Sequence, residues 1–318
     1  MINIYAVYLS VTIAYLMGTF LFRRHSPMDR FATLFGIFAI LLWSMSVALT
    51  RSLAEALGPF GAAASIYTVS GIMVWMVAGK PTLRGQSPAY LILCGLLFVF
   101  YMVAFSLAIG LANSRQQTLE LGLVNYLWPS LTLLFAVPLL KIRARWWMWP
   151  GLVLAFVGVL WAISGGRGLS VHQLLENVRS NPLAYALAAG AAISWALYSN
   201  LVRLFSKGKG VLPLFLLATG GVLWGLYFSF SSTRLHLDWP AVGELLMMGA
   251  ITAISYQCWD LAMKKGNATL VAALSYFTPL SSIFIAGVWL NTLPGSSFWP
   301  GVGMVVAGSL LCWSASRK

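Results

Sequence analysis

The chain has 318 residues, of which 60% are hydrophobic and only 8% are charged, with a formal net charge of +13. A soluble domain carries about 25% charged residues, so this composition excludes an ordinary soluble protein. Apolar runs of about 20 residues recur along the chain and match the hydrocarbon thickness of a bilayer. This pattern predicts an all-α polytopic membrane protein.

The basic residues lie in short connections between apolar runs, which disfavours nucleic acid as a partner. Cys94, Cys258 and Cys312 are far apart and each lies within an apolar run, so we expect packed thiols without a disulfide framework. The three histidines stand singly, and no metal site is expected. No phosphate-binding loop or zinc-hydrolase motif occurs, so the sequence predicts no cofactor and no enzyme.

The first apolar run covers about residues 2–22 and is followed by Arg23 and Arg24. A secretory signal carries its basic residues first, so this run is not interpreted as one. Two interpretations of the N-terminal extension, residues 1–27, remain open. It is an additional membrane helix, or it is peripheral to a fold that begins at Met28.

Ten core spans follow the extension. Their expected limits are 31–50, 59–79, 88–111, 117–140, 146–164, 182–203, 211–230, 240–263, 268–290 and 297–315. When Lys and Arg are assigned to alternate sides, 15 of the 20 fall on one side and five on the other. The positive-inside rule then predicts a cytoplasmic C-terminus.

The longest connection, residues 165–181, carries apolar residues at roughly helical spacing and predicts a short interfacial helix. A gate or lid is the functional alternative for this segment. The expected division is a first repeat over 28–166, a periplasmic linker helix over 167–181 and a second repeat over 182–318. Asp238, Pro240 and Glu244 are interpreted as the cap, first turn and dipole partner of the eighth span.

The sequence contains an internal duplication. Trp149-Pro150-Gly151 with Gly158 returns as Trp299-Pro300-Gly301 with Gly308, 150 residues later. Each copy holds five spans, an odd number, so the second copy enters the membrane from the opposite side. Inverted repeats of this kind are typical of secondary transporters, which place the substrate near the midplane and work by alternating access. The paired glycines are interpreted as close helix packing.

Prolines interrupt one membrane run in each copy. Asn125-Tyr126-Leu127-Trp128-Pro129 and Ser275-Tyr276-Phe277-Thr278-Pro279 lie at the same offset of 150. Proline removes a backbone donor inside a helix, so Pro129 and Pro279 are predicted helix breaks. The breaks expose polar backbone groups that a substrate or a neighbouring segment must satisfy.

Aromatic residues are expected near the midplane, where rings can stack on a flat solute or attract an ammonium group. The candidate substrate-binding rings are Trp43, Tyr101, Tyr126, Trp128, Trp195, Tyr198, Tyr256, Trp259 and Tyr276. Ordinary packing against lipid or neighbouring helices is the alternative for each. Asn125 and Ser275 occupy equivalent positions and are candidates for holding a zwitterion, whereas interhelical hydrogen bonding is the alternative, as it is for Asn200 and Gln257.

Two acidic residues are candidate charge or proton sites. Glu120 lies about one turn inside the fourth span, and either contacts an ammonium group, carries a proton, or is stabilised by the positive end of its own helix. Asp260 precedes Lys264 by four residues, so an interfacial ion pair is favoured over a substrate role.

The chain resembles the drug/metabolite transporter superfamily, of the EamA type, and within it the YddG-type aromatic amino acid exporters. The segments that carry the resemblance are Leu57-Gly58-Pro59, Asn125 to Ser130, Ser275 to Pro279 and Gly308 to Trp313. The resemblance implies a multi-pass inner-membrane exporter with a central cavity, in which Tyr126 and Trp128 form the wall, Trp195 faces them, and Pro129 and Pro279 break their helices.

The leading hypothesis is an exporter of neutral aromatic amino acids that functions as a monomer in the bilayer. An exporter of aromatic cations is the nearest alternative and would need a buried acid. A passive channel and a membrane enzyme acting on lipid-linked substrates are the alternatives from other classes.

Overall fold

The computed structural model describes residues 27–164, 171–206, 211–232, 234–266 and 268–316. Within these residues every regular element is a helix. They are α2 (Pro27–Ser44), α3 (Ser46–Leu57), α4 (Pro59–Ala78), the π-helix η1 (Tyr90–Cys94), α5 (Gly95–Gly110), α6 (Arg115–Asn125), α7 (Trp128–Leu140), α8 (Met148–Ile163), α9 (Val171–Ser180), α10 (Pro182–Phe205), α11 (Leu212–Phe230), α12 (Trp239–Lys265), α13 (Ala268–Ser275), α14 (Thr278–Trp289) and α15 (Trp299–Ala315).

Seven helical stretches are long and apolar enough to cross a membrane. They are Arg30–Leu57, Pro59–Ala78, Tyr90–Gly110, Arg115–Leu140, Pro182–Phe205, Leu212–Phe230 and Trp239–Ala262. Three further apolar helices, α8, α14 and α15, are shorter. The prediction of an all-helical polytopic membrane protein is therefore confirmed at this level for the described residues. Residues 1–26 of the N-terminal extension lie outside them, so its two interpretations stay predictions.

Local sequence signals fix several helix ends. Gly58, with φ of 74°, ends α3, and Pro59 begins α4 directly after it. Asp238 caps α12 by accepting a hydrogen bond from the Ala241 amide, and Pro240 lies in the first turn, as the sequence predicts. Glycine tolerates the left-handed backbone and proline fits a first helical turn, so these residues separate adjacent helices sharply.

The first span is longer than the sequence predicts. It was expected to end near residue 50, but α3 continues to Leu57. Arg51 and Glu55 lie in this last part and form an ion pair at 2.9 Å, four residues apart on one helix face. Their mutual pairing lets the helix continue beyond the apolar run.

Both spans in which the sequence predicts a proline break are interrupted. The fourth span divides into α6 and α7, separated by Tyr126 and Leu127, and Pro129 lies in the first turn of α7. The ninth span divides into α13 and α14, and Pro279 lies in the first turn of α14. Each proline follows the break because it fits a helix start and cannot continue the preceding ladder.

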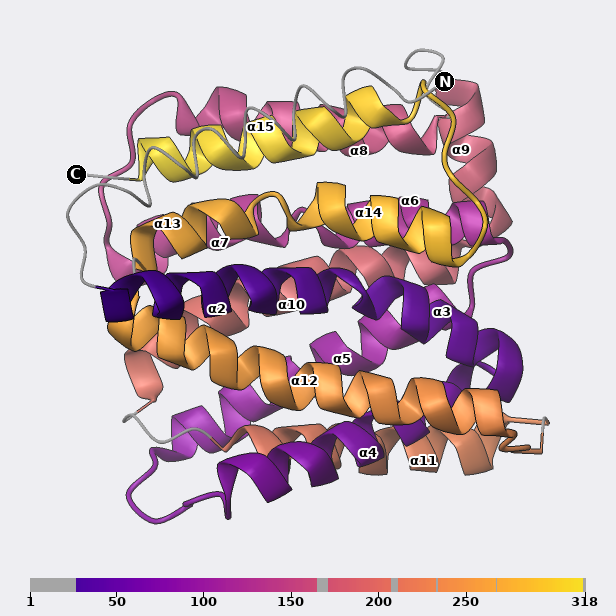
Figure 1. Cartoon of the computed structure of the whole chain (residues 1–318). Helices are drawn as coiled ribbons and strands as arrows, with labels where there is room; N and C mark the ends of the chain where they lie inside the picture. Colours follow the sequence, from indigo (N-terminus) through magenta and orange to yellow (C-terminus); the bar gives the residue numbers. More distant parts are fainter. Residues whose placement is uncertain (1–26, 165–170, 207–210, 233, 267, 317–318) are drawn as a thin grey trace.

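The helices lie roughly side by side in one bundle (Figure 1). The most extensive packing joins α8 to α15, α4 to α11, α2 to α12 and α5 to α10. In Figure 1, α8 and α15 form the upper edge of the bundle and α4 and α11 the lower edge. The interrupted spans and the pairs α2–α12 and α5–α10 lie between these edges, so they occupy the middle of the protein.

The glycines of the duplicated motif bring α8 and α15 into backbone contact. A Cβ added to Gly158 would lie 2.5 Å from the main-chain oxygen of Gly301, and one added to Gly301 would lie 2.6 Å from that of Gly158. Gly151 and Gly308 meet in the same reciprocal way. The early glycine of each helix faces the late glycine of the other, so the two helices are antiparallel.

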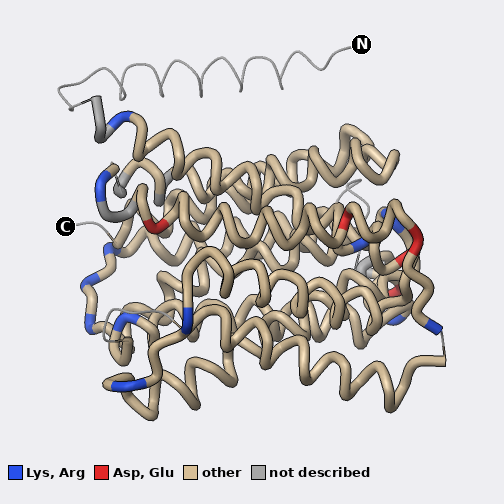
Figure 2. The backbone as a smooth tube through the Cα atoms, turned by 60° about the horizontal axis from the view of Figure 1, so that its bottom comes forward, with Lys and Arg blue, Asp and Glu red and all other residues tan. Residues whose placement is uncertain are grey.

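The connection between the halves contains α9, as a helix was expected there, and α9 stands across one end of the bundle (Figure 1). Cys94, Cys258 and Cys312 are buried and unoxidised. Figure 2 shows most Lys and Arg residues gathered at the opposite end, whereas most acidic residues lie at the end that carries α9. We name these the basic end and the acidic end.

Candidate functional site

Aromatic side chains form two groups in the middle of the bundle. The Trp195 group comprises Phe98 and Tyr101 of α5, Trp128 of α7, and Trp195 and Tyr198 of α10. Trp195 is its hub, with ring centroids 4.5 Å from Tyr101, 5.1 Å from Tyr198, 6.1 Å from Phe98 and 6.5 Å from Trp128. These separations are those of stacked and edge-on aromatic pairs.

The Trp43 group comprises Trp43 of α2 with Tyr256 and Trp259 of α12. The ring centroid of Trp43 lies 5.5 Å from that of Tyr256 and 5.0 Å from that of Trp259. The Tyr256 hydroxyl lies near those of Tyr101 and Tyr198, which brings the two groups toward each other. In each group a tryptophan of one helix packs against two aromatic residues, three positions apart, of its neighbour.

Asn125 supplies a buried polar group beside these rings. It is the last residue of α6, its side chain is 2% exposed, and it lies against the Tyr101 hydroxyl. Its Oδ1 atom has no hydrogen-bond partner within the described part of the chain. Pro129, four residues later, has no amide to donate to the Asn125 main-chain oxygen. Two acceptors of one residue therefore lie at the break, where an unpaired buried acceptor is costly.

Tyr126 and Ser282 extend this polar region toward the second half. Tyr126 is 5% exposed and lies near Ser282 on α14, whose buried hydroxyl has no hydrogen-bond partner within the described residues. The sequence did not single out Ser282, because a serine inside an apolar run more often bonds its own helix. Asn200 donates from Nδ2 to the main-chain oxygens of Thr132 on α7 and Ala196 on its own helix, both at 2.9 Å. The first bond is the interhelical role, and the Asn200 Oδ1, like that of Asn125, has no hydrogen-bond partner within the described residues.

The structure does not bring every candidate to this place. Tyr276 packs against Trp313 of α15, with ring centroids 6.4 Å apart, and makes no recorded ring contact with Trp128 or Trp195 among the described residues. The main-chain oxygen of Ser275 accepts a hydrogen bond from the Thr278 hydroxyl at 2.6 Å. The side chain of Gln257 on α12 is exposed, and its expected role at membrane depth stays a prediction.

The two candidate acids have different surroundings. Glu120 is 7% exposed and accepts a hydrogen bond from the Tyr185 hydroxyl at 2.6 Å. Tyr185 of α10 was not predicted as a partner, since only the fold brings it to α6. Asp260 is exposed near the basic end of α12, and the side chain of Lys264, its expected partner, is not described.

A polytopic helical bundle whose interrupted helices meet aromatic and polar groups in the interior has the architecture of a secondary transporter. Residues 182–314 match the EamA-like transporter family. The chain is 40% identical over 287 residues to the aromatic amino acid exporter YddG of Escherichia coli (strain K12), covering 90% of this chain and 98% of that protein. The YddG of Salmonella typhimurium is 39% identical over the same coverage. The chain therefore belongs to the EamA-like transporter family, together with its YddG relatives.

Two more distant similarities agree with this assignment. The aromatic amino acid exporter YddG of Ancylobacter novellus is 30% identical over 300 residues, covering 90% of this chain and 98% of that protein. A crystal structure of a protein 27% identical in sequence matches with a TM-score of 0.62, over 90% of this chain and 97% of the other. The likeness thus covers the fold as a whole and is not confined to the second half.

Proposed function

We propose that this protein exports aromatic amino acids across the inner membrane by alternating access, with the Trp195 and Trp43 groups binding the substrate side chain. Asn125 carries the proposal. It is the buried residue that offers an unpaired Oδ1 and a main-chain oxygen released by Pro129, directly beside the rings. Two oxygen acceptors suit the ammonium group of an amino acid, and the adjacent aromatic faces suit its ring.

The architecture that would support this cycle is ten spans in two inverted repeats, 28–166 and 182–318, joined by the linker helix at 167–181. Three features support it. The duplicated glycines meet reciprocally across antiparallel helices. Lys141 and Asn291, 150 residues apart, have φ angles of 52° and 51° at equivalent helix ends. The pair α2–α12 corresponds to α10–α5 when the first five spans are exchanged with the last five.

The chemistry of the interior favours a neutral substrate over an aromatic cation. A cation exporter would need an acid that faces the rings, whereas the carboxylate of Glu120 is engaged by the Tyr185 hydroxyl. Neutral zwitterions need only paired acceptors and donors of the kind found at Asn125 and Tyr126. The basic end carries most Lys and Arg (Figure 2), so we assign it, with the C-terminus, to the cytoplasm.

Counterflow in proteoliposomes tests the proposal. The full chain is purified as a monomer, reconstituted, loaded with unlabelled Phe, and supplied with labelled Phe outside. We expect saturable accumulation of label, which Asn125→Ala and Trp195→Ala reduce by about tenfold or more. Trp149→Ala, at a position 60% exposed on α8, is the matched control and should retain the flux.

Absence of Phe counterflow by the reconstituted wild type would reject the proposed substrate class. Accumulation that rises linearly with Phe and shows no counterflow would indicate a passive channel. If aromatic cations are transported instead, and Glu120→Gln abolishes that transport, the cation alternative gains. Product formation from a lipid-linked substrate would revive the enzyme alternative.

A further inference from the structure

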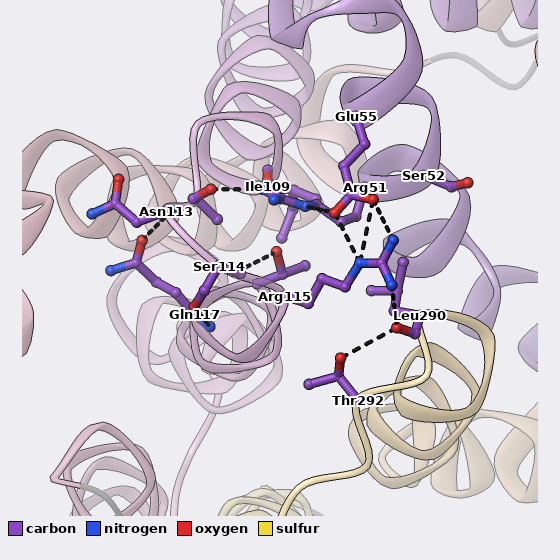
Figure 3. Close-up of polar contacts among 12 residues, drawn as sticks. Arg51, Ser52, Glu55, Ile109, Asn113, Ser114, Arg115, Gln117, Leu290 and Thr292 are labelled. Carbon is purple, nitrogen blue, oxygen red and sulfur yellow. Dashed lines mark hydrogen bonds and ion pairs between the residues drawn. The ribbon is translucent and has the colours of Figure 1, made fainter.

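A network of ion pairs holds the acidic end together (Figure 3). Arg115, at the start of α6, contacts both carboxylate oxygens of Glu55 on α3, with Nη2 to Oε2 at 2.6 Å and Nε to Oε1 at 3.0 Å. Arg51 donates from Nε to the same Oε1 at 2.9 Å. We name Arg51, Glu55 and Arg115 the clasp. Two guanidinium groups share one carboxylate, a geometry that is strongly directional.

The clasp also reaches main-chain oxygens of neighbouring segments. Arg51 Nη1 donates to the Ala112 oxygen at 2.7 Å, which ties α3 to the α5–α6 connection. Arg115 Nη1 donates to the Leu290 oxygen at 2.7 Å. Leu290 directly follows α14 and precedes the left-handed Asn291, so the donated charge meets the negative end of that helix (Figure 3). The clasp thereby joins α3 and α6 of the first half to α14 of the second.

A second hydrogen bond at the same end crosses between the halves. The Ser52 hydroxyl on α3 donates to Oε1 of Glu244 on α12 at 2.8 Å. From the sequence, Glu244 was interpreted only as a partner of its own helix dipole. Its contact with Ser52 is seen only in the folded structure. The acidic end is closed by polar contacts from α3 and α6 to both α12 and α14.

The basic end also carries polar contacts between the halves, since the Ser87 hydroxyl donates to the Phe205 main-chain oxygen at 3.0 Å and Asn200 Nδ2 to that of Thr132 at 2.9 Å. It differs from the acidic end in the residues that stand at the positions of the clasp. The position that corresponds to Arg115 is Lys265, and the one that corresponds to Arg51 is Arg203. The counterpart of Glu55 is Lys207, which lies outside the described residues, so the sequence offers only cations at these positions. In the described residues α6 packs against α14 at the acidic end, and α7 packs against α10 toward the basic end.

We propose that the clasp is the release-side gate of the transporter: it closes the acidic end while the basic end admits substrate, and it must open for release. The inference rests on the proposed transport function and on the assignment of the basic end to the cytoplasm. An exporter must load from the cytoplasm, so a gate that favours closure on the far side keeps the site available to its substrate. Because the clasp lies at the surface, with Arg115 45% exposed, it can separate into water when the halves rock.

Cysteine accessibility tests the gate without any substrate. Val47, on α3 and 1% exposed, lies inward of the clasp beside Gly122 and Ile283. Val47→Cys is introduced into the full chain, and an impermeant maleimide is added to the acidic-end side of oriented vesicles. The chain without this substitution corrects for Cys94, Cys258 and Cys312. We expect slow labelling of the single variant, and labelling at least fivefold faster when Glu55→Gln or Arg115→Gln is added.

Two further variants separate gating from general damage. Arg115→Lys keeps the charge but loses the paired contacts to Glu55, so labelling should be intermediate. Glu176→Gln removes the exposed His172–Glu176 pair, 3.4 Å long, on α9, and should leave labelling unchanged. Thermal unfolding of each variant checks that it is folded, and Arg115→Lys carries the test if the glutamine variants fail to fold.

The outcomes distinguish the gate from the transport function. Unchanged labelling in folded clasp variants of a protein that exchanges Phe would overturn the gate and leave the function intact. Faster labelling in a protein that does not exchange Phe would support the gate and reject the substrate class. Faster labelling from the basic-end side alone would overturn the assignment of the clasp to the release side.

Discussion

The two interrupted spans differ although their sequences are equivalent. Proline removes the donor for the main-chain oxygen of Asn125 in the first break and of Ser275 in the second. Thr278 repairs the second break, because its hydroxyl donates to the Ser275 oxygen at 2.6 Å. The equivalent residue in the first break is Trp128, whose ring packs against Trp195 and leaves that repair unmade. In the second break a neighbouring residue of the same segment bonds the freed main-chain oxygen. In the first break the main-chain oxygen of Asn125 stays available to another partner.

The first break is also more deeply buried than the second and lies closer to the aromatic groups. Asn125 and Tyr126 are 2% and 5% exposed and lie among the central rings and Ser282. Tyr276 is only partly buried and packs against Trp313 near the edge formed by α15. A duplicated motif therefore places equivalent backbone breaks without placing equivalent binding groups, and we expect the first break to dominate substrate binding.

The largest expected effect concerns the contact between α8 and α15, to which the two halves contribute equivalent glycines. Gly158→Leu and Gly301→Leu each force a side chain against the opposing main-chain oxygen, 2.5 and 2.6 Å from the added Cβ. Separating α8 from α15 should cost about 3 kcal/mol or more in unfolding free energy, equally for both variants. Thermal unfolding in detergent measures it. Gly303→Leu, which meets open space on α15, is the matched control. Unequal losses would show that the two glycines are not symmetric partners.

The second prediction compares the two tryptophan hubs. Trp195 contacts four rings and Trp43 contacts two. Trp195→Ala should lower Phe counterflow by more than tenfold, or about 1.4 kcal/mol, and Trp43→Ala by about threefold. Initial rates over a range of Phe concentrations measure both. A larger loss for Trp43→Ala would move the main ring site to the second helix pair.

The third prediction compares the equivalent polar residues of the breaks. Asn125→Ala removes the unpaired acceptor and should reduce counterflow about tenfold, mainly through weaker binding, since a hydrogen bond to a charged group contributes about 1.5–3 kcal/mol. Ser275→Ala should change it by less than twofold, because the main-chain oxygen of Ser275 keeps Thr278. Saturation kinetics separate binding from turnover. Equal losses would contradict the difference between the breaks.

The smallest expected effect makes the second break resemble the first. Thr278→Val keeps the side-chain shape but removes the hydroxyl, so the Ser275 oxygen loses its partner. We expect about 1 kcal/mol lower unfolding stability and little change in Phe counterflow. Thr132→Val, which removes a hydroxyl bonded within a continuous helix to the Trp128 oxygen, controls for loss of a helical threonine. A strong transport defect in Thr278→Val would assign a substrate role to the second break.

The sequence alone determined the class of protein and much of its layout. Composition and run length predicted membrane helices because hydrophobic thickness and backbone satisfaction act on each segment separately. Gly58, Pro59 and Asp238 gave helix boundaries for the same local reason. The resemblance carried by the proline motifs identified the family that the relatives then showed.

Only the tertiary structure decided which polar and aromatic groups meet. The contacts that matter link residues 65, 156 and 175 positions apart in the sequence. They are Glu120 with Tyr185, Tyr126 with Ser282, and Arg115 with Leu290. No helical periodicity encodes such separations, because hydrophobic patterning specifies that a face is buried and not which partner covers it. The clasp shows this most directly. Its arginines were counted only as loop charges in the sequence, whereas in the fold they contact Glu55 and connect the two halves.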